Sequence, residues 1–582
     1  MNQNRLLIKP EAVESFTTLY EIMTHARDTY PTQTAYRQPE GKEEEQTVTF
    51  AGFASMVESL RAALINRGFG GKHIALFGEA SIEWIAVYVA VVSGVGVCVP
   101  IDKELPPETI VTQMNFSDSE LVFCSARGLR KLQKCLPDCP AVNDAVVMRK
   151  NAVSAVPGAE RVCTLADLIA EGEALLKEKG SAALPAVIDP DALAVIIFTS
   201  GTTGANKGVM LSNRNVMGTL RGCARLLHYP ETSISVLPVN HSYELHAHLM
   251  SCMYCGTTVS LNDDLKHMLR NLERFAPEMS CMVPLMLDLI VRRMKKQIAE
   301  KGLEKTFART VKLSNALLKT GVDLRRRLFK DLLAPLGGNL RMIICGGAAL
   351  SQETIDFLKN IGIQVYNGYG ITECAPVAAV NPSAGTRRFS VGYVLPTMEV
   401  RIQDPDAGGN GEIQVRGDNV MLGYYKAPAD TAQVFTEDGW FRTGDIGRID
   451  RDGYLYISGR LKNLIILPNG KNICPEELEE ALMKRIPYIK ECVVMADDAN
   501  TGLYAVCYLD PDFRASHGLA DEAAAKAFMQ ADFNAYNSSE PGFKRLTDFS
   551  IRDTEFEKST THKIQRFKIA GVNQKKEAQT HV

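Results

Sequence analysis

The sequence has little excess charge of either sign. Its 65 lysines and arginines almost balance 68 aspartates and glutamates, which leaves a formal net charge of -3 at pH 7. A strongly basic surface draws nucleic acid to a protein, so this balance predicts no nucleic-acid partner. We find no internal repeat and no long low-complexity segment. A length of 582 residues predicts roughly three to four domains or subdomains.

The sequence also lacks a dense cysteine framework and a secretory leader. Its 14 cysteines do not have the close spacing of small disulfide-rich secreted domains. The first residues, MNQNRLLIKPEAVESF, contain no long apolar stretch of the kind that a signal peptide has. We therefore expect reduced thiols and a cytoplasmic protein.

Long apolar runs are scarce. One stretch comes close to the length of a membrane span, WIAVYVAVVSGVGVCVPI from Trp84 to Ile101. It is slightly short for a span, and Gly94 and Gly96 interrupt it. We predict instead a buried helix that passes into a buried strand.

Side chains of the kind that bind metals crowd together in one segment, HSYELHAHLMSCMYC. Zinc is one interpretation, but the spacing matches no common ligand pattern and no second cysteine pair follows. The helical spacing favours a helix packed in the core. The side chains concerned are His241, His246, His248, Cys252 and Cys255.

The pattern of apolar residues changes along the chain. Up to about residue 384, runs such as HIALFG and VCVPID alternate with helical patterns, which is typical of α/β layers with largely parallel sheets. Short strands and Gly, Asp and Asn turns then predict a small all-β subdomain, and a mixed pattern follows. The expected parts are 1–190 and 191–384 (α/β), 385–459 (β), a hinge at 460–463, and 464–582.

A basic helical stretch lies between about residues 290 and 330, with RRMKKQ and DLRRRLFKDLL. A solvated helix face is the simpler interpretation, and contact with an anionic membrane surface is the alternative. Peripheral contact with the inner face of the membrane stays open, and so does a homodimer.

The most informative stretch is IIFTSGTTGANKGVMLS, from Ile196 to Ser212. Its apolar run ends at Phe198, and small, hydroxylated and glycine residues follow with one cation, Lys207. Glycine lets backbone N–H groups approach an anion, hydroxyls donate to it and lysine adds charge, so phosphate is the expected ligand. No glycine precedes Lys207, so this is not a Walker A loop and a P-loop kinase is disfavoured. Ser212 is expected to cap a helix.

The order of residues in this stretch is more specific than its composition. FTSGTTGANKGVMLSNRN closely resembles the phosphate loop of the AMP-forming adenylate synthetases, which include acyl-CoA synthetases, adenylation domains of peptide synthetases and firefly-type luciferases. Further motifs of that superfamily follow in order over nearly the whole chain: LPVNHSYEL, IICGGAAL, YNGYGITE, GWFRTGDIGRIDRDGYLYISGRLKN and HKIQR. The resemblance implies an α/β fold with a large N-terminal domain and a small mobile α+β C-terminal domain. The large domain would hold two stacked α/β subdomains and a small β-barrel-like one.

The resemblance implies how ATP and Mg²⁺ are held. The residues expected to wrap the β- and γ-phosphates are Thr199, Ser200, Gly201, Thr202, Thr203, Gly204 and Lys207. Thr372 would donate to the α-phosphate. Glu373, with Thr203, would hold Mg²⁺, a hard cation that prefers carboxylate and other oxygen ligands.

The nucleoside has its own expected residues. Tyr369 would lay its ring on adenine, and Asp445 would accept from both ribose hydroxyls. Arg460 would contact ribose or phosphate from the hinge side. The other residues expected around the adenine and ribose are Gly346, Gly347, Ala348, Asn367, Gly368 and Gly370.

The resemblance also assigns the moving parts. Lys563 would stabilise the charge that builds when a carboxylate attacks the α-phosphate. The superfamily usually has glycine before this lysine, whereas this chain has His562. The C-terminal domain would then rotate about Lys462, bringing Gly470 beside the tunnel for the thiol, and His241 would act as its gate.

Within the superfamily, the segment LLKTGVDLRRRLFKDLLAPLGGNLRMIICGGAAL looks like the helical insertion of long-chain fatty acyl-CoA synthetases. The implied reaction converts a medium- or long-chain fatty acid to an acyl-adenylate with release of pyrophosphate, then transfers the acyl group to CoA. The alternatives are a stand-alone loader of a carrier-protein phosphopantetheine and an inactive nucleotide-binding regulator. Because the chain ends nineteen residues past Lys563, we expect no carrier domain and a thiol supplied in trans.

Overall fold

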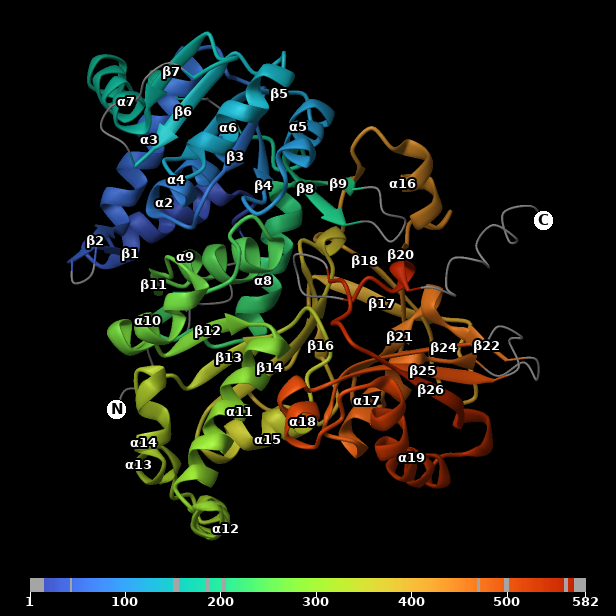
Figure 1. Ribbon diagram of the computed structural model, residues 1–582. Helices are drawn as coiled ribbons and strands as arrows, with labels where there is room; N and C mark the ends of the chain where they lie inside the picture. Colours follow the sequence, from blue (N-terminus) through green and yellow to red (C-terminus); the bar gives the residue numbers. More distant parts are fainter. Residues whose placement is uncertain are drawn as a thin grey trace. The chain divides into compact units, whose positions relative to one another are not determined.

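The computed structural model describes residues 15–41, 44–149, 156–184, 188–200, 206–467, 472–496, 502–558 and 564–569. The chain forms two compact units. The first comprises Met1–Val400 with Val415–Phe441, and the second comprises Arg401–Gln414 with Arg442–Val582. Both mix helices and strands (Figure 1), which confirms the expected α/β class. The hinge at 460–463 concerns movement and stays a prediction.

An eight-stranded sheet lies in the first unit, with the strand order β19-β9-β8-β4-β3-β5-β6-β7. Strands β3 to β8 run parallel to one another, whereas β9 is antiparallel to β8. Every residue of β6 is buried, as expected for a parallel strand covered on both faces. The strands are β3 (His73–Phe77), β4 (Val97–Ile101), β5 (Ser119–Ser125), β6 (Asp144–Met148), β7 (Arg161–Thr164), β8 (Leu193–Ser200), β9 (Asn206–Ser212) and β19 (Gly423–Tyr424).

Helices flank this sheet on both faces (Figure 1). They are α3 (Phe50–Asn66), α4 (Ile82–Ala90), α5 (Pro107–Phe116), α6 (Leu129–Cys135) and α7 (Leu165–Lys179). After α4 a π-helical turn, Val91–Val95, leads into β4. Gly94 has a φ of +93°, and a Cβ at Gly96 would lie 2.2 Å from the carbonyl oxygen of Lys72. The predicted passage from buried helix to buried strand is confirmed, and no helix among the described residues is long and apolar enough to cross a membrane.

Nine consecutive strands of a second sheet lie in the first unit, in the order β16-β15-β14-β13-β12-β10-β11-β1-β2. Within it β11, β10, β12, β13 and β14 run parallel to one another, whereas β15 is antiparallel to β14. The nine strands are β1 (Thr34–Glu40), β2 (Glu44–Thr49), β10 (Thr232–Ser235), β11 (Thr258–Leu261), β12 (Met279–Met282), β13 (Met342–Cys345), β14 (Gln364–Gly370), β15 (Val377–Val380) and β16 (Gly392–Val394). Because β1 and β2 join this sheet while β8 and β9 join the other, a division at residue 190 does not follow the sheets.

The helices of this region are α2 (Leu19–Thr29), α8 (Asn213–Leu226), the π-helix η4 (Tyr243–Met250), α9 (Ser251–Tyr254), α10 (Met268–Phe275), α11 (Pro284–Glu300), α12 (Glu304–Lys319), α13 (Arg325–Leu328), α14 (Lys330–Leu333) and α15 (Gln352–Asn360). Ser212 caps α8, as predicted, by accepting from the N–H of Asn215. The HSYELHAHLMSCMYC segment is a buried helix, although its first turns are π-helical rather than α-helical.

The second unit is built on a three-stranded sheet of β24 (Ile489–Ala496), β25 (Leu503–Leu509) and β26 (Leu546–Arg552). Helices α17 (Pro475–Arg485) and α19 (Glu522–Ser539) contribute Leu482 and Phe533 to its core. In the sequence, Pro475 followed by Glu476 and Glu477 predicts the first turn of a helix, and α17 begins at this proline.

The segment 385–459 is not all-β, which corrects the expectation from sequence. It contains the strands β17 (Met398–Gln403), β18 (Gly411–Gly417), β20 (Phe441–Ile449) and most of β21 (Tyr454–Arg460). It also contains the helix α16 (Pro428–Val434), which Pro428 opens from a first-turn position.

Candidate active site

The predicted phosphate loop joins β8 to β9, the two strands of an antiparallel pair. Thr199 lies opposite Lys207, and Ser200 lies opposite Asn206. This pairing brings the two ends of the loop together beside Lys207, the cation predicted to bind phosphate. Gly201, Thr202, Thr203 and Gly204 lie outside the described residues, so their predicted contacts with phosphate stay predictions.

Lys207 lies among side chains that the sequence did not indicate. Its Nζ is 3.2 Å from Oδ2 of Asp430 and 4.8 Å from the centre of the Tyr424 ring. Strand β19 brings Tyr424 there by pairing with β9, where Tyr424 lies opposite Val209. Lys207 is therefore held between an acidic side chain and an aromatic face, with its position fixed from two directions.

Tyr424 also reaches the predicted metal ligand. Its hydroxyl donates to Oε1 of Glu373 over 2.9 Å, and the N–H of Met421 donates to the Glu373 carbonyl over 2.8 Å. Burial and the neighbouring Glu373 carboxylate both raise the pKa of Tyr424, so the phenol stays protonated and remains a donor. One tyrosine thus orients the Glu373 carboxylate and packs against the Lys207 ammonium group.

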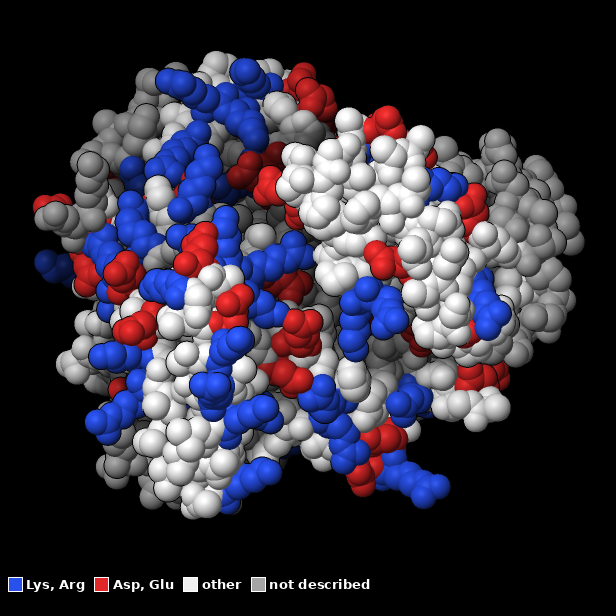
Figure 2. All heavy atoms as spheres, turned by 60° about the horizontal axis from the view of Figure 1, so that its bottom comes forward, with Lys and Arg blue, Asp and Glu red and all other residues white. Residues whose placement is uncertain are grey.

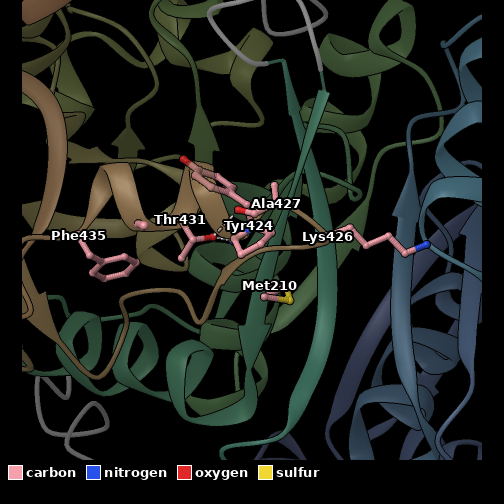
Figure 3. A pocket seen from close by; sticks show the side chains of 8 residues that line it. Met210, Tyr424, Lys426, Ala427, Thr431 and Phe435 are labelled. Atoms are coloured by element: carbon pink, nitrogen blue, oxygen red, sulfur yellow. Dashed lines mark hydrogen bonds between the residues drawn. The ribbon is translucent and has the colours of Figure 1, made fainter.

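A shallow apolar pocket of about 480 Å³ lies beside Tyr424, between β9 and α16 (Figure 3). Within it, the Tyr424 N–H donates to Oγ1 of Thr431 over 2.9 Å. Neither Glu373 nor Lys207 lines the pocket. It therefore borders the polar cluster without belonging to it. The lining residues are Met210, Tyr424, Lys426, Ala427, Pro428, Thr431, Ala432 and Phe435.

The turn that carries Thr372 and Glu373 meets the start of helix η4. The Ser242 hydroxyl donates to Oγ1 of Thr372 over 3.4 Å, and both residues are buried. The N–H of Tyr243 donates to Nδ1 of His241 over 3.3 Å, and its hydroxyl donates to the carbonyl of Ile344 in β13 over 3.0 Å. The predicted gate His241 is thus next in sequence to a residue that contacts Thr372.

The residues predicted around adenine follow two neighbouring parallel strands. Gly346, Gly347 and Ala348 come after β13, and residues 367–370 end β14, with Cys345 opposite Asn367. Ligands commonly bind at the carboxyl ends of parallel strands.

Glycine is required at two of these positions. Gly347 has a φ of +90°, in the left-handed region that side chains disfavour. A Cβ at Gly370 would lie 1.9 Å from the carbonyl oxygen of Pro376. Gly346 and Gly368 lie close together, because a Cβ at Gly346 would be 3.5 Å from the carbonyl oxygen of Gly368. Tyr369, between Gly368 and Gly370, is half-buried.

The histidine-rich helix has structural partners. Nδ1 of His248 is 2.8 Å from Oε1 of Glu244, and its Nε2 is 2.6 Å from Oγ of Ser233. Nε2 of His246 is 2.8 Å from the Tyr88 hydroxyl. Burial lowers the pKa of His246 to about 3, so the ring is neutral. Among the described residues, no group of three His, Cys, Asp or Glu side chains could hold a metal ion.

The second unit holds the predicted ribose carboxylate. Asp445 is buried, and its Oδ1 is 3.0 Å from Nε of Arg460 directly across the β20–β21 pair. Lys462 lies in the next turn, where Asn463 donates to Oε1 of Glu476 over 2.6 Å. Asp445 and Arg460 thus form one charged pair beside the predicted hinge. Gly470 and Lys563 lie outside the described residues, and their roles stay predictions.

Comparison with known proteins gives a consistent result. The AMP-binding enzyme family model matches residues 23–425. The long-chain-fatty-acid–CoA ligase FadD15 of Mycobacterium tuberculosis is 28% identical over 548 residues, covering 90% of this chain and 87% of that protein. The human long-chain-fatty-acid–CoA ligase ACSBG1 is 28% identical over 538 residues, covering 87% of this chain and 73% of that protein.

Solved structures share the fold. The A domain of a carboxylic acid reductase from Segniliparus rugosus, in complex with AMP and a co-purified carboxylic acid, has a TM-score of 0.76 at 20% identity, over 99% of this chain and 96% of that one. The ATP-bound RpMatB-BxBclM chimera B1 has a TM-score of 0.72 at 23% identity, over 97% and 99% of the two chains.

Proposed function

The chain belongs to the AMP-binding enzyme family and is an AMP-forming acid–thiol ligase, and on that premise we propose that its acid is a medium- or long-chain fatty acid and its thiol is CoA. The names of the 28% identical relatives, which are long-chain-fatty-acid–CoA ligases, support this choice of substrates. We further propose that the enzyme works in the cytoplasm.

The observation that carries the proposal is the cluster of Lys207, Tyr424 and Glu373 beside Thr372. A cation held by β9 suits the β- and γ-phosphates, and Thr372 is placed one residue from the carboxylate. With adenine at the ends of β13 and β14, the triphosphate would extend toward Lys207. The fatty acid carboxylate would then attack the α-phosphate in line, and pyrophosphate would leave with its charge offset by Lys207.

The oxygen donors around Glu373 suit magnesium. Glu373 supplies carboxylate oxygens, and the Tyr424 hydroxyl fixes their orientation. Groups that donate a hydrogen bond to a metal ligand commonly orient it in this way. Glu373 would hold the ion, with Thr203 as the further ligand expected from sequence. When bound, Mg²⁺ offsets charge on the phosphate oxygens.

The two half-reactions need different arrangements of the second unit. We propose that Lys563 serves the adenylation step and that rotation about Lys462 then brings Gly470 to the thiol tunnel, where His241 gates entry. Rotation of this kind would also shield the acyl-adenylate from water. The Asp445–Arg460 pair lies next to this hinge in sequence and would bind the ribose.

The deciding experiment is ATP–pyrophosphate exchange over a panel of acids, followed by thioester assays with CoA and with a phosphopantetheinyl carrier protein. We expect exchange to be fastest with medium- or long-chain fatty acids and thioester to form on CoA. Exchange with amino acids instead, or thioester on the carrier protein alone, would support a carrier-protein loader. If no acid supports exchange, the protein is an inactive nucleotide-binding regulator.

Replacing Tyr424 with phenylalanine should weaken the response to magnesium. The change removes the hydroxyl that orients Glu373 and keeps the ring against Lys207. We expect the Mg²⁺ concentration for half-maximal exchange to rise about tenfold, the usual cost of losing a partner of a metal ligand. Tyr425→Phe is the matched control, because the Tyr425 hydroxyl donates to the exposed Asp118. Equal magnesium curves for the two variants would contradict the assignment.

A further inference from the structure

The surface of helices α11, α12 and α13 is unusual for its exposed apolar side chains. Of the eleven large hydrophobic side chains that are exposed among the described residues, six lie between residues 285 and 328. Single exposed leucines are ordinary on proteins, whereas a concentration in one short stretch marks an interaction site. The six are Leu285, Leu289, Leu303, Leu313, Val322 and Leu328, and Leu289 and Leu313 are each 58% exposed. We call this region the α11–α13 surface.

The same stretch is strongly basic. Residues 284–331 contain thirteen lysines and arginines against five aspartates and glutamates, a net charge of +8 in a chain whose total is -3. The positive charge is therefore local and the rest of the chain is acidic. Figure 2, with the bottom of Figure 1 turned forward, shows lysine and arginine side chains around uncharged surface at the lower left.

Some of these cations have structural partners. Lys295 pairs with Glu353, and Arg325 pairs with Asp323 over 2.7 Å. Arg326 donates to the carbonyl of Leu340 over 2.8 Å. By contrast, no acidic partner within the described part of the chain pairs with a group of exposed cations on α11 and α12. That group is Arg292, Arg293, Lys296, Lys305, Arg309 and Lys312.

Helix α11 presents the apolar and basic side chains on one stripe. Leu285, Leu289, Arg292 and Lys296 are exposed and follow one another at spacings of four, three and four residues, which places them on one face. The opposite face is packed in the core through residues such as Met294. The outer face therefore has leucines in its first half and cations in its second.

Helix α12 repeats this arrangement. Lys305, Arg309, Lys312 and Leu313 are exposed at spacings of four, three and one residues and so share a face. Phe307 lies on the other side and packs against the same core as α11. Two adjacent helices thus combine exposed leucines with cations that have no acidic partner among the described residues, a composition typical of helices that lie in a lipid interface.

We propose that the α11–α13 surface docks the enzyme on an anionic lipid bilayer, with its exposed leucines among the acyl chains and its cations on the headgroups. Nucleic acid as the partner would explain the cations but not the exposed leucines. A neutral apolar partner would explain the leucines but not the cations. The benefit of docking rests on the proposed function. A long-chain fatty acid partitions into membranes, so a docked enzyme would take up its substrate there.

The test is co-sedimentation of the full chain with vesicles of phosphatidylcholine, with and without phosphatidylglycerol. We expect binding to the anionic vesicles that falls as salt rises. The double variant Leu289→Ser, Leu313→Ser should raise the lipid concentration for half-maximal binding about tenfold or more. The triple variant Arg292→Gln, Lys296→Gln, Lys312→Gln should do the same.

Matched controls distinguish the effect of this surface from general effects of losing a leucine, losing three lysines or destabilising the fold. Leu265→Ser removes an exposed leucine elsewhere, and Lys134→Gln, Lys177→Gln, Lys179→Gln together remove three exposed lysines elsewhere. Both controls should bind within about twofold of wild type, since they leave the docking surface intact. Thermal unfolding of each variant should match wild type.

Three outcomes would overturn the proposal: equal binding to neutral vesicles, surface variants that bind like their controls, or tight binding to duplex DNA that survives loss of the leucines. Exchange measured without lipid, with a short water-soluble fatty acid, should be the same in wild type and surface variants. If wild type shows no exchange, the proposed function fails, while the vesicle result still decides the docking surface.

Discussion

Replacing Lys563 with alanine is expected to slow fatty acid-dependent ATP–pyrophosphate exchange on the order of a hundredfold or more. Attack of the carboxylate on the α-phosphate builds charge on the five-coordinate phosphorus, and a lysine delivered to it acts as a preorganised point charge. Loss of one such donor typically costs ~3 kcal/mol of transition-state stabilisation. Thioester formation from preformed acyl-adenylate should change little, since that step would proceed with Lys563 rotated away.

Lys568→Ala is the matched control for this experiment. Lys568 lies five residues further on and pairs at 2.5 Å with the exposed Glu557, so its loss should leave exchange within about twofold of wild type. His562→Gly restores the residue usual in the superfamily and should also stay within a few-fold, because it leaves the charge of Lys563 in place. Equal rates in the Lys563 and Lys568 variants would remove Lys563 from the mechanism.

Glu373→Gln should give the second large effect, a loss of exchange of about a hundredfold at low Mg²⁺ that partly recovers as Mg²⁺ rises. Glutamine keeps an oxygen that can accept from Tyr424 but removes the negative charge that draws the cation. Removing a partner of a ligand already costs about 10- to 100-fold in metal affinity, so loss of a ligand charge should cost at least as much.

The control is Glu399→Gln, which removes an exposed carboxylate paired with Arg416 on the surface. Its magnesium curve should match wild type, because exposed pairs contribute little. The double variant Glu373→Gln, Tyr424→Phe should be no worse than Glu373→Gln alone, since the hydroxyl acts through the carboxylate. Additive losses would mean that Tyr424 acts by some other route, such as its contact with Lys207.

Local signals were sufficient for several elements. Ser212 before an apolar periodic stretch predicted the start of α8, and Pro475 with its following glutamates predicted the start of α17. In the Trp84–Ile101 stretch, two glycines marked where a helix had to end before β4. In each case the interaction that determines where the helix begins or ends involves residues close in sequence, so the sequence alone predicts it.

The contacts of Lys207 could not be predicted in this way. Tyr424 and Asp430 lie more than two hundred residues further along the chain, and they reach Lys207 only because β19 pairs with β9. Nothing in the stretch around Tyr424 indicates that its hydroxyl meets Glu373. For the same reason, the membership of β1 and β2 in the second sheet depends on pairing with the distant β11.

The pairing of Lys207 with Asp430 has a consequence for turnover. A triphosphate that reaches Lys207 would compete with a counter-ion that the protein itself supplies, so a ligand with more negative charge than one carboxylate would compete best. ATP and pyrophosphate would meet this condition if Lys207 binds the β- and γ-phosphates, as we propose. AMP, which has no β- or γ-phosphate, would offer Lys207 nothing in place of Asp430, so the proposed assignment predicts that the spent nucleotide is held less firmly.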